Sequence, residues 1–276
     1  MYPYPLKGKI ERRELALGIY FVSGSEMMLE LIGMAGMDFV IIEMEHGTLG
    51  PMDQRALLPL VKIAQSHQVT PIVRLAAGNP IAVGKVLDAG VGGVYITHVL
   101  DKKGAEEAVA SARFAPQGTR GGGPLAASNN YVGEPGPYFA NTNPNIIVGF
   151  LIEDEEAVEN FEEISDVEGI TFASPSKWDL ALSMGYDSPS HPKVEEARQK
   201  VIGICKRKGI PMIDSAPTPT GGAAFAFDVE KMRGLYEDGL RLITVSPEPH
   251  MLYAACKAKV DHAREFASKL DAKKSR

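Results

Sequence analysis

The chain alternates short apolar runs with longer amphipathic stretches, and this alternation constrains the fold more than any other feature. Apolar runs rich in β-branched residues cover 16–21, 38–43, 69–75, 92–97, 146–152, 169–173, 210–213 and 240–245. Stretches with helical spacing cover 26–34, 52–66, 81–89, 103–112, 155–165, 192–208, 228–238 and 249–270. Such alternation predicts parallel strands buried on both faces and connected by helices.

Eight such units in 276 residues predict an α/β fold of the (β/α)8 barrel type, whose usual length is about 250 residues. The competing layout is an open doubly wound sheet. However, no predicted strand is followed by the G-x-G-x-x-G turn of a dinucleotide-binding site. We therefore expect one barrel domain over residues 1–276 that ends in a long C-terminal helix.

Composition and charge exclude several classes of protein. Hydrophobic residues make up 45% and charged residues 23% of the chain, which excludes a disordered or fibrous protein. The net charge is −6 and the only basic patch is the C-terminal tail, so nucleic acid is not an expected partner. The absence of a long apolar run excludes a membrane span, and the polar start indicates a cytoplasmic protein. Two cysteines are expected to pack as small apolar groups.

Ionisable residues stand at the ends of several predicted strands, where barrel enzymes gather their working groups. Glu153 and Asp179 follow consecutive strands and could converge on a hard divalent cation, although either could instead begin a helix. His46 follows two glutamates and could be a general base or a structural residue. Arg74 would either pair with an acid or bind a substrate oxyanion.

Three further features leave alternatives open. His98 ends the fourth predicted strand and could be a polar site contact or pack against a neighbouring subunit. Residues 115–145 lack periodicity, and a loop of this length is often functional. Its glycine-rich part around Arg120 could bind an anion, or the segment could be a connector. Lys177 lies in a loop rather than at a strand end, so solvent or substrate contact is expected for it rather than Schiff-base formation.

A series of motifs covers the chain from about residue 17 to residue 214. They read GMDFVIIEMEHG at 36–47, VR at 73–74, VLDAG at 86–90, ARFAPQGTRG at 112–121, IE at 152–153, AVEN at 157–160, DLALSMGY at 179–186 and HP at 191–192. In this order and spacing they resemble the class II pyruvate aldolases of the HpcH/HpaI type.

The resemblance implies a (β/α)8 barrel that forms a homo-oligomer, such as a trimer of dimers that exchange their last helix. It also implies a divalent cation, Mg²⁺ or alternatively Mn²⁺ or Co²⁺, held by Glu153 and Asp179. This cation would bind pyruvate or another 2-oxoacid and stabilise its enolate as a Lewis acid. Arg74 would stabilise the same oxyanion, and His46 would move protons on the aldehyde side.

The resemblance assigns further residues. Asp88 matches an acid that pairs with His46, but it precedes the fourth strand and would have to come from a neighbouring subunit. Glu43 is a site contact where the family usually has aspartate. The segment that ordinarily holds the pyruvate carboxylate supplies the candidate substrate-binding residues Ser174, Pro175 and Ser176. Arg120 is a further candidate because of the glycine-rich loop around it, not because of the resemblance.

Departures from the family pattern gather around the small-molecule site. Leu151 replaces the usual glutamine, and the loop at 174–180 lacks its glycine and has two added residues. We therefore predict a divergent metal-dependent aldolase that cleaves or forms 4-hydroxy-2-oxoacids. The alternatives are oxaloacetate decarboxylation or a specialised condensation through the same enolate, and a non-catalytic metabolite-binding barrel. The aldehyde would be selected by the loops at 115–145 and 217–227.

Overall fold

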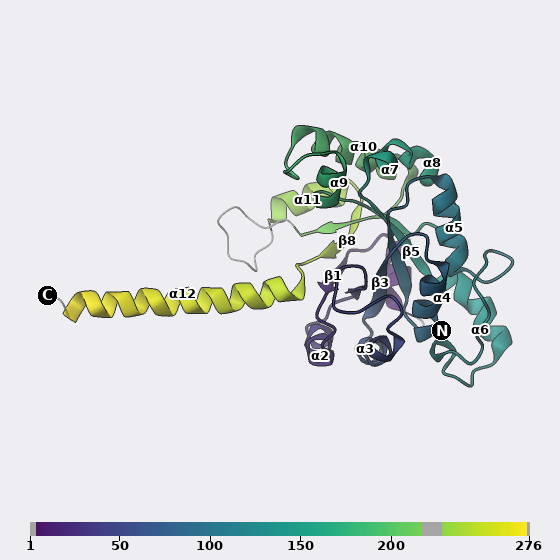
Figure 1. Ribbon diagram of the computed structural model, residues 1–276, viewed down its shortest axis with the longest axis horizontal. Helices are drawn as coiled ribbons and strands as arrows, with labels where there is room; N and C mark the ends of the chain where they lie inside the picture. The colour runs from purple at the N-terminus through teal and green to yellow at the C-terminus, as the bar shows by residue number, and fades with distance from the viewer. Residues whose placement is uncertain (1–3, 217–227, 275–276) are drawn as a thin grey trace.

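The computed structural model describes residues 4–216 and 228–274, the last four of these as backbone only. Eight parallel strands form a closed barrel in the order of the sequence, so the predicted (β/α)8 fold is confirmed (Figure 1). The strands are β1 Ala16–Phe21, β2 Phe39–Glu43, β3 Thr70–Ala76, β4 Gly93–Thr97, β5 Ile147–Ile152, β6 Phe172–Pro175, β7 Met212–Ser215 and β8 Leu240–Thr244. The loop expected at 217–227 lies outside the described residues.

Helices precede, connect and follow the strands, and several of them begin after a residue that caps the helix. They are α1 Pro5–Glu11, α2 Glu26–Met34, α3 Gln54–Ser66, α4 Pro80–Ala89, α5 Lys102–Ala112, α6 Pro135–Thr142, α7 Glu155–Glu159, α8 Phe161–Ile164, α9 Trp178–Ser183, α10 Pro192–Lys208, α11 Val229–Glu237 and α12 Glu248–Lys274. Asp53, Asn79 and Asp101 each accept a hydrogen bond from a backbone N–H in the first turn of their helix. Short 3-10 helices occur at Ala127–Asn129 and Asn143–Asn145.

Two strands lie further along the chain than the apolar pattern predicts. The sixth was expected at 169–173 but spans Phe172–Pro175, and Gly169 takes a left-handed φ of 101° just before it. The seventh was expected at 210–213 but spans Met212–Ser215. Because of these shifts, the ends of β6 and β7 include polar residues. Ser174 and Asp214 are therefore strand residues at the rim of the barrel.

Large apolar side chains fill the inside of the barrel. Helix α1, which the polar start of the chain did not suggest, contributes Leu6 and Ile10 to this cluster. Every strand contributes at least one other member, and Tyr20 of β1 packs against the cluster but is only partly buried. The strand members are Ala16, Phe39, Ile41, Ile72, Tyr95, Ile147, Leu151, Phe172, Ile213 and Leu242. Because the interior is packed, a small molecule can bind only at a rim.

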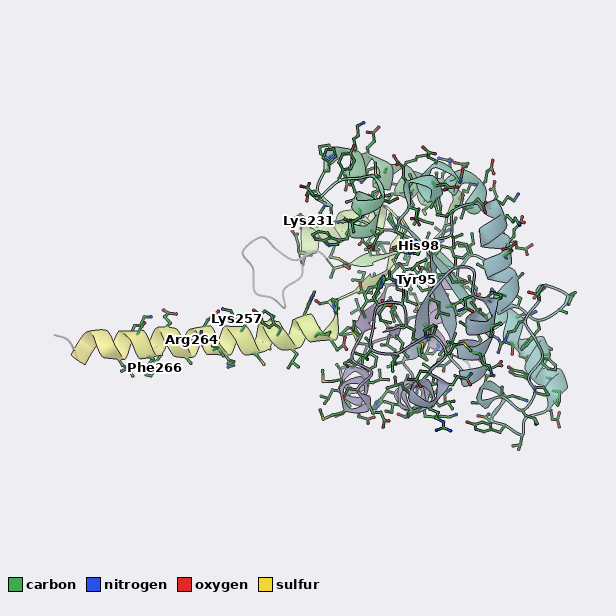
Figure 2. The ribbon with its side chains drawn as sticks, viewed as in Figure 1. Tyr95, His98, Lys231, Lys257, Arg264 and Phe266 are labelled. Atoms are coloured by element: carbon green, nitrogen blue, oxygen red, sulfur yellow. The ribbon has the colours of Figure 1, made fainter. Side chains whose placement is uncertain are left out.

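Helix α12 projects away from the barrel (Figure 1). Its side chains, among them Lys257, Arg264 and Phe266, extend into solvent along its length, and Phe266 is 61% exposed (Figure 2). Cys256 is exposed on this helix, whereas Cys205 is buried in α10, so apolar packing of the cysteines is found only for Cys205. Within the described part of the chain, no helix is long and apolar enough to cross a membrane.

Candidate active site

Three acids surround Arg74 at the rim where the strands end. Parallel strands finish on the same side of a barrel, so Glu43 at the end of β2 and Glu153 directly after β5 lie near Arg74 on β3. The guanidinium of Arg74 lies 3.0 Å from Glu43 Oε2, 2.9 Å from Glu45 Oε2 and 3.9 Å from Glu153 Oε2. Of the two roles considered for Arg74, the structure therefore shows pairing with acids.

The chain after β2 turns back on itself and is held by Glu43. The Oε1 atom of Glu43 accepts hydrogen bonds from the backbone N–H groups of Glu45, at 2.9 Å, and His46, at 3.1 Å. Gly47 follows, and a Cβ there would lie 2.3 Å from the carbonyl oxygen of Glu43, which only glycine avoids. Glu43 thus orients Arg74 and shapes the loop that carries His46.

Glu153 is a buried carboxylate that makes no hydrogen bond to any residue the structure describes. It is 1% exposed, and neither Oε1 nor Oε2 has a hydrogen-bond partner among the described residues. Burial raises the pKa of Glu153 to about 8; Arg74 and His98 oppose this rise, while Asp179 adds to it. An unpartnered buried carboxylate is costly, so its oxygens suit a cation that the protein binds from solution.

A second group of possible metal ligands includes Glu153 and lies beside β4 and β5. His98, Glu153 and Asp154 each offer an atom, and these atoms lie within 4.8 Å of one another. His98 Nδ1 is 3.1 Å from Asp154 Oδ2, and its Nε2 is 3.6 Å from Glu153 Oε1. His98 has a φ of 55°, an uncommon backbone conformation for a residue other than glycine. Asp179, in the first turn of α9, is close enough to raise the pKa of Glu153.

His46 lies at the edge of this group rather than inside it. Its side chain is 66% exposed, and its Nε2 lies 3.8 Å from Glu45 Oε2. Glu45 in turn accepts a 2.7 Å hydrogen bond from Thr97 Oγ1. His46 is therefore free to meet a substrate or a neighbouring chain from the solvent side.

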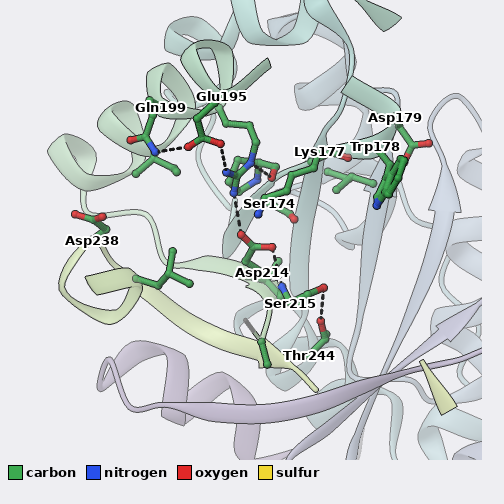
Figure 3. Close-up of a pocket in the computed structure, with 18 of the residues that line it drawn as sticks. Ser174, Lys177, Trp178, Asp179, Glu195, Gln199, Asp214, Ser215, Asp238 and Thr244 are labelled. Atoms are coloured by element: carbon green, nitrogen blue, oxygen red, sulfur yellow. Dashed lines mark hydrogen bonds and ion pairs between the residues drawn. The ribbon is translucent and has the colours of Figure 1, made fainter. Parts of the chain in front are cut away.

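A pocket of about 740 Å³ opens beside Arg74 (Figure 3). Arg74, Leu151 and Asp179 are among its lining residues. The predicted carboxylate-binding segment forms one wall, which consists of Ser174, Pro175 and Ser176. The other walls come from β7, β8, α10 and α11, with the lining residues Glu195, Arg198, Gln199, Asp214, Ser215, Lys231 and Thr244. Of the predicted site residues, Arg74, Asp179 and the segment 174–176 line this cavity, and Glu153 lies 3.9 Å from Arg74.

Two predicted site residues lie elsewhere in the same chain. Asp88 is near the end of α4, and Arg120 follows α5, so both lie at the rim where the strands begin. Arg120 donates a 2.7 Å hydrogen bond to Asp88 Oδ1 and lies over the ring of Phe114, 4.4 Å from its centroid. Within one chain, the structure therefore brings Asp88 and Arg120 together but apart from Glu153 and Arg74.

Comparison with known proteins identifies the family. The model of the HpcH/HpaI aldolase/citrate lyase family matches residues 16–244. The chain belongs to this family. It is 30% identical over 220 residues to the 5-keto-4-deoxy-D-glucarate aldolase of Shigella sonnei. This alignment covers 79% of this chain and 84% of the relative. The enzyme of the same name from Escherichia coli O139:H28 is 30% identical over 222 residues, with the same coverage. The predicted resemblance is confirmed, and the protein is an enzyme of the aldolase and lyase class.

Solved structures support the same assignment. A family member from Burkholderia cenocepacia is 28% identical, with a TM-score of 0.81 over 95% of this chain and 99% of that one. The citrate synthase SbnG is 25% identical, with a TM-score of 0.79 over 95% of this chain and 98% of that one. Macrophomate synthase, at 24% identity, a TM-score of 0.83 and coverage of 98% and 93%, shares the fold.

Several groups at the site do not stand out in the sequence. Glu45 stands beside His46 in the sequence, and in the structure it binds Arg74 and Thr97. Asp154 directly follows Glu153 in the sequence, and in the structure it pairs with His98. In the sequence, Arg198 looks like any charged residue of an amphipathic helix. Its burial results from tertiary packing, which the sequence pattern does not show.

Proposed function

We propose that the protein is a metal-dependent carbon–carbon lyase that cleaves or forms 4-hydroxy-2-oxoacids through the enolate of pyruvate. The observation that carries this proposal is Glu153, a buried carboxylate with both oxygens unpartnered among the described residues, next to the cationic Arg74. A site of this kind offers hard oxygen ligands to a cation and a guanidinium to an oxyanion.

Glu153 and Asp179 are the proposed metal ligands, and Mg²⁺, Mn²⁺ and Co²⁺ are the candidates. The donor set fits a hard divalent ion, since carboxylate oxygens are the preferred ligands of such ions. A bound divalent ion would supply Lewis acidity that makes the methyl protons of a 2-oxoacid more acidic. The group of His98, Glu153 and Asp154 is the competing ligand set, because its atoms already lie within 4.8 Å of one another.

The protein's own residues would divide the remaining work. Arg74, held in place by Glu43 and Glu45, would donate hydrogen bonds to the developing enolate oxygen. The wall formed by Ser174, Pro175 and Ser176 would hold the carboxylate of the 2-oxoacid. His46, exposed on the loop after β2, would exchange a proton with the hydroxyl of the aldehyde-derived carbon.

Exchange of the pyruvate methyl protons in deuterated water tests the proposal. With Mg²⁺, Mn²⁺ or Co²⁺ present, NMR should show enzyme-dependent loss of the methyl signal, and a chelator should stop it. Absence of exchange at every metal loading would contradict an enolate mechanism. Adding aldehydes then separates an aldolase, which consumes pyruvate faster in their presence, from an oxaloacetate decarboxylase. The 4-hydroxy-2-oxo diacid implied by the name of the Shigella sonnei relative is a first substrate to assay.

The two possible ligand sets make opposite predictions for a pair of matched variants. Asp179→Asn should weaken Mn²⁺ binding about 10- to 100-fold, because it removes one charged ligand. Asp154→Asn should change the affinity less than threefold if Asp154 only pairs with His98 at 3.1 Å. Titration calorimetry or Mn²⁺ EPR measures both. The reverse order would assign the metal to His98, Glu153 and Asp154.

The role proposed for Asp88 requires a neighbouring subunit, and complementation between chains tests it. The side chain of Asp88 is 29% exposed, and Arg120 binds its Oδ1 atom. The exposed part of the carboxylate can therefore contact another chain. His46→Ala and Asp88→Ala proteins should each be inactive. After mixed refolding, some sites combine the intact residues, and up to about a quarter of the activity should return. An inactive mixture that forms normal oligomers would contradict the intersubunit pair.

A further inference from the structure

The barrel is weakly closed between β6 and β7. These strands share a single register pair, Ala173 with Met212, whereas every other neighbouring pair of strands shares three or more. Pro175 at the end of β6 has no N–H to donate, and a bulge after Met212 shifts the pairing of β7 with β8. The backbone alone therefore does little to fix the end of β6 beside β7, where the pocket opens.

Arg198 occupies this gap. It belongs to α10, is 4% exposed, and donates in three directions. Its Nε donates to the carbonyl oxygen of Pro175 at 3.2 Å, its Nη1 to Glu195 at 3.0 Å and its Nη2 to Asp214 at 2.9 Å (Figure 3). One guanidinium thus connects the ends of β6 and β7 with the helix that packs outside them.

The contact with Pro175 reaches the metal side of the site through one peptide group. The carbonyl of Pro175 and the N–H of Ser176 belong to the same planar unit. Arg198 binds the carbonyl, and the N–H donates to the carbonyl oxygen of Ile152 at 3.0 Å. Ile152 immediately precedes Glu153. The peptide between Pro175 and Ser176 is therefore held from both sides, and its orientation fixes where the next residues begin.

We propose that Arg198 is a positioning residue of the active site, which fixes the segment at 174–179 that forms the carboxylate-binding wall and carries Asp179. The expected kinetic effects rest on the proposed function, whereas the expected effect on the mobility of the segment at 174–179 does not. Lysine could not replace Arg198 fully, because one ammonium cannot reach three acceptors in a planar fork. Without its guanidinium, the Pro175 carbonyl, Glu195 and Asp214 would each lose the hydrogen bond that Arg198 donates.

The only tryptophan of the chain lies in this segment and provides a direct probe. Trp178 is 67% exposed at the start of α9, three residues after Pro175. We expect Arg198→Met to increase the amplitude of nanosecond motion in the fluorescence anisotropy decay of Trp178 about twofold. Arg198→Lys should give an intermediate value. This measurement needs neither metal nor substrate.

Arg113→Met is the matched control for the loss of a buried arginine. Arg113 is 8% exposed, but it lies at the opposite end of the barrel, where it donates to the Gly169 carbonyl at 3.4 Å. We expect the control to lower the melting temperature without changing Trp178 anisotropy. If Arg198→Met lowered only the melting temperature in the same way, Arg198 would be structural and the inference would be wrong.

Pyruvate exchange kinetics give the second measurement. Arg198→Met should raise the KM for pyruvate about tenfold and change kcat much less, and Arg198→Lys should recover part of the loss. An unchanged KM in both variants would overturn the positioning role. If the wild-type protein showed no exchange, the proposed function would fail, while Trp178 anisotropy would still decide whether Arg198 holds the segment. If Arg198→Met did not fold, Arg198→Lys and Asp214→Asn would test the same contacts.

Discussion

Replacing Glu153 by glutamine should lower the rate of pyruvate methyl exchange by about 10³-fold or more and abolish tight binding of the divalent ion. An amide oxygen is a weaker ligand than a carboxylate, and Glu153 contributes its charge where water cannot substitute for it, since it is 1% exposed. NMR exchange and metal analysis of the purified variant measure the two effects. Glutamine has nearly the same shape, so the barrel should remain folded.

The same substitution should stabilise the metal-free protein at high pH. Burial raises the pKa of Glu153 from 4.5 to about 8, so the folded state prefers the protonated acid. The contribution of this group to stability is therefore fully present below pH 4.5 and is lost as the pH rises through about 8. Glutamine cannot ionise. Between pH 5 and pH 9, the free energy of unfolding of Glu153→Gln should therefore rise relative to that of the wild type by on the order of 2 kcal/mol.

Chemical denaturation at several pH values, with a chelator present, measures this gain. Glu163→Gln, an exposed change in α8, is the matched control and should follow the wild type at every pH. A variant that keeps metal affinity and exchange, or that gains no stability at pH 9, would show that Glu153 is not the buried ligand that we propose.

Replacing Arg74 by lysine should lower kcat for the same exchange by about 10²- to 10³-fold. Arg74 lies between Glu43 and Glu45, at 3.0 and 2.9 Å, and a lysine ammonium cannot span both while donating to an enolate oxygen. Burial opposes the charge of Arg74, but the neighbouring glutamates raise its pKa above the ordinary value, so the wild-type site stays cationic at neutral pH. The charge is kept in the variant, so the loss would reflect geometry.

Steady-state exchange and Mn²⁺ binding distinguish the explanations for a loss in Arg74→Lys. Metal affinity should change little, because Arg74 is not a ligand. Arg55→Lys, on the exposed face of α3, is the control for the chemical change. A variant with kcat within threefold of the wild type would limit Arg74 to a structural ion pair.

The linear pattern was sufficient for the architecture because buried strands and amphipathic helices leave local periodic signals. It also identified the strand ends that carry Glu43, Arg74 and Glu153, since parallel strands must end at one rim. The pattern misplaced β6 and β7 by two to three residues, because apolar residues continue from the preceding turns into these short strands. It missed α1, whose Leu6 and Ile10 are only two buried residues in a polar segment.

The family, the barrel and the residue types at its rim can be predicted from the chain, because they depend on periodicity and on short motifs. Which of those groups contact one another follows from the three-dimensional fold alone. It placed Arg74 among three acids, left Glu153 without hydrogen-bond partners in the described chain, and joined Asp88 to Arg120 at the opposite rim. It also buried Arg198 in the gap between β6 and β7. Burial and pairing depend on contacts between residues far apart in the chain, and no local pattern encodes them.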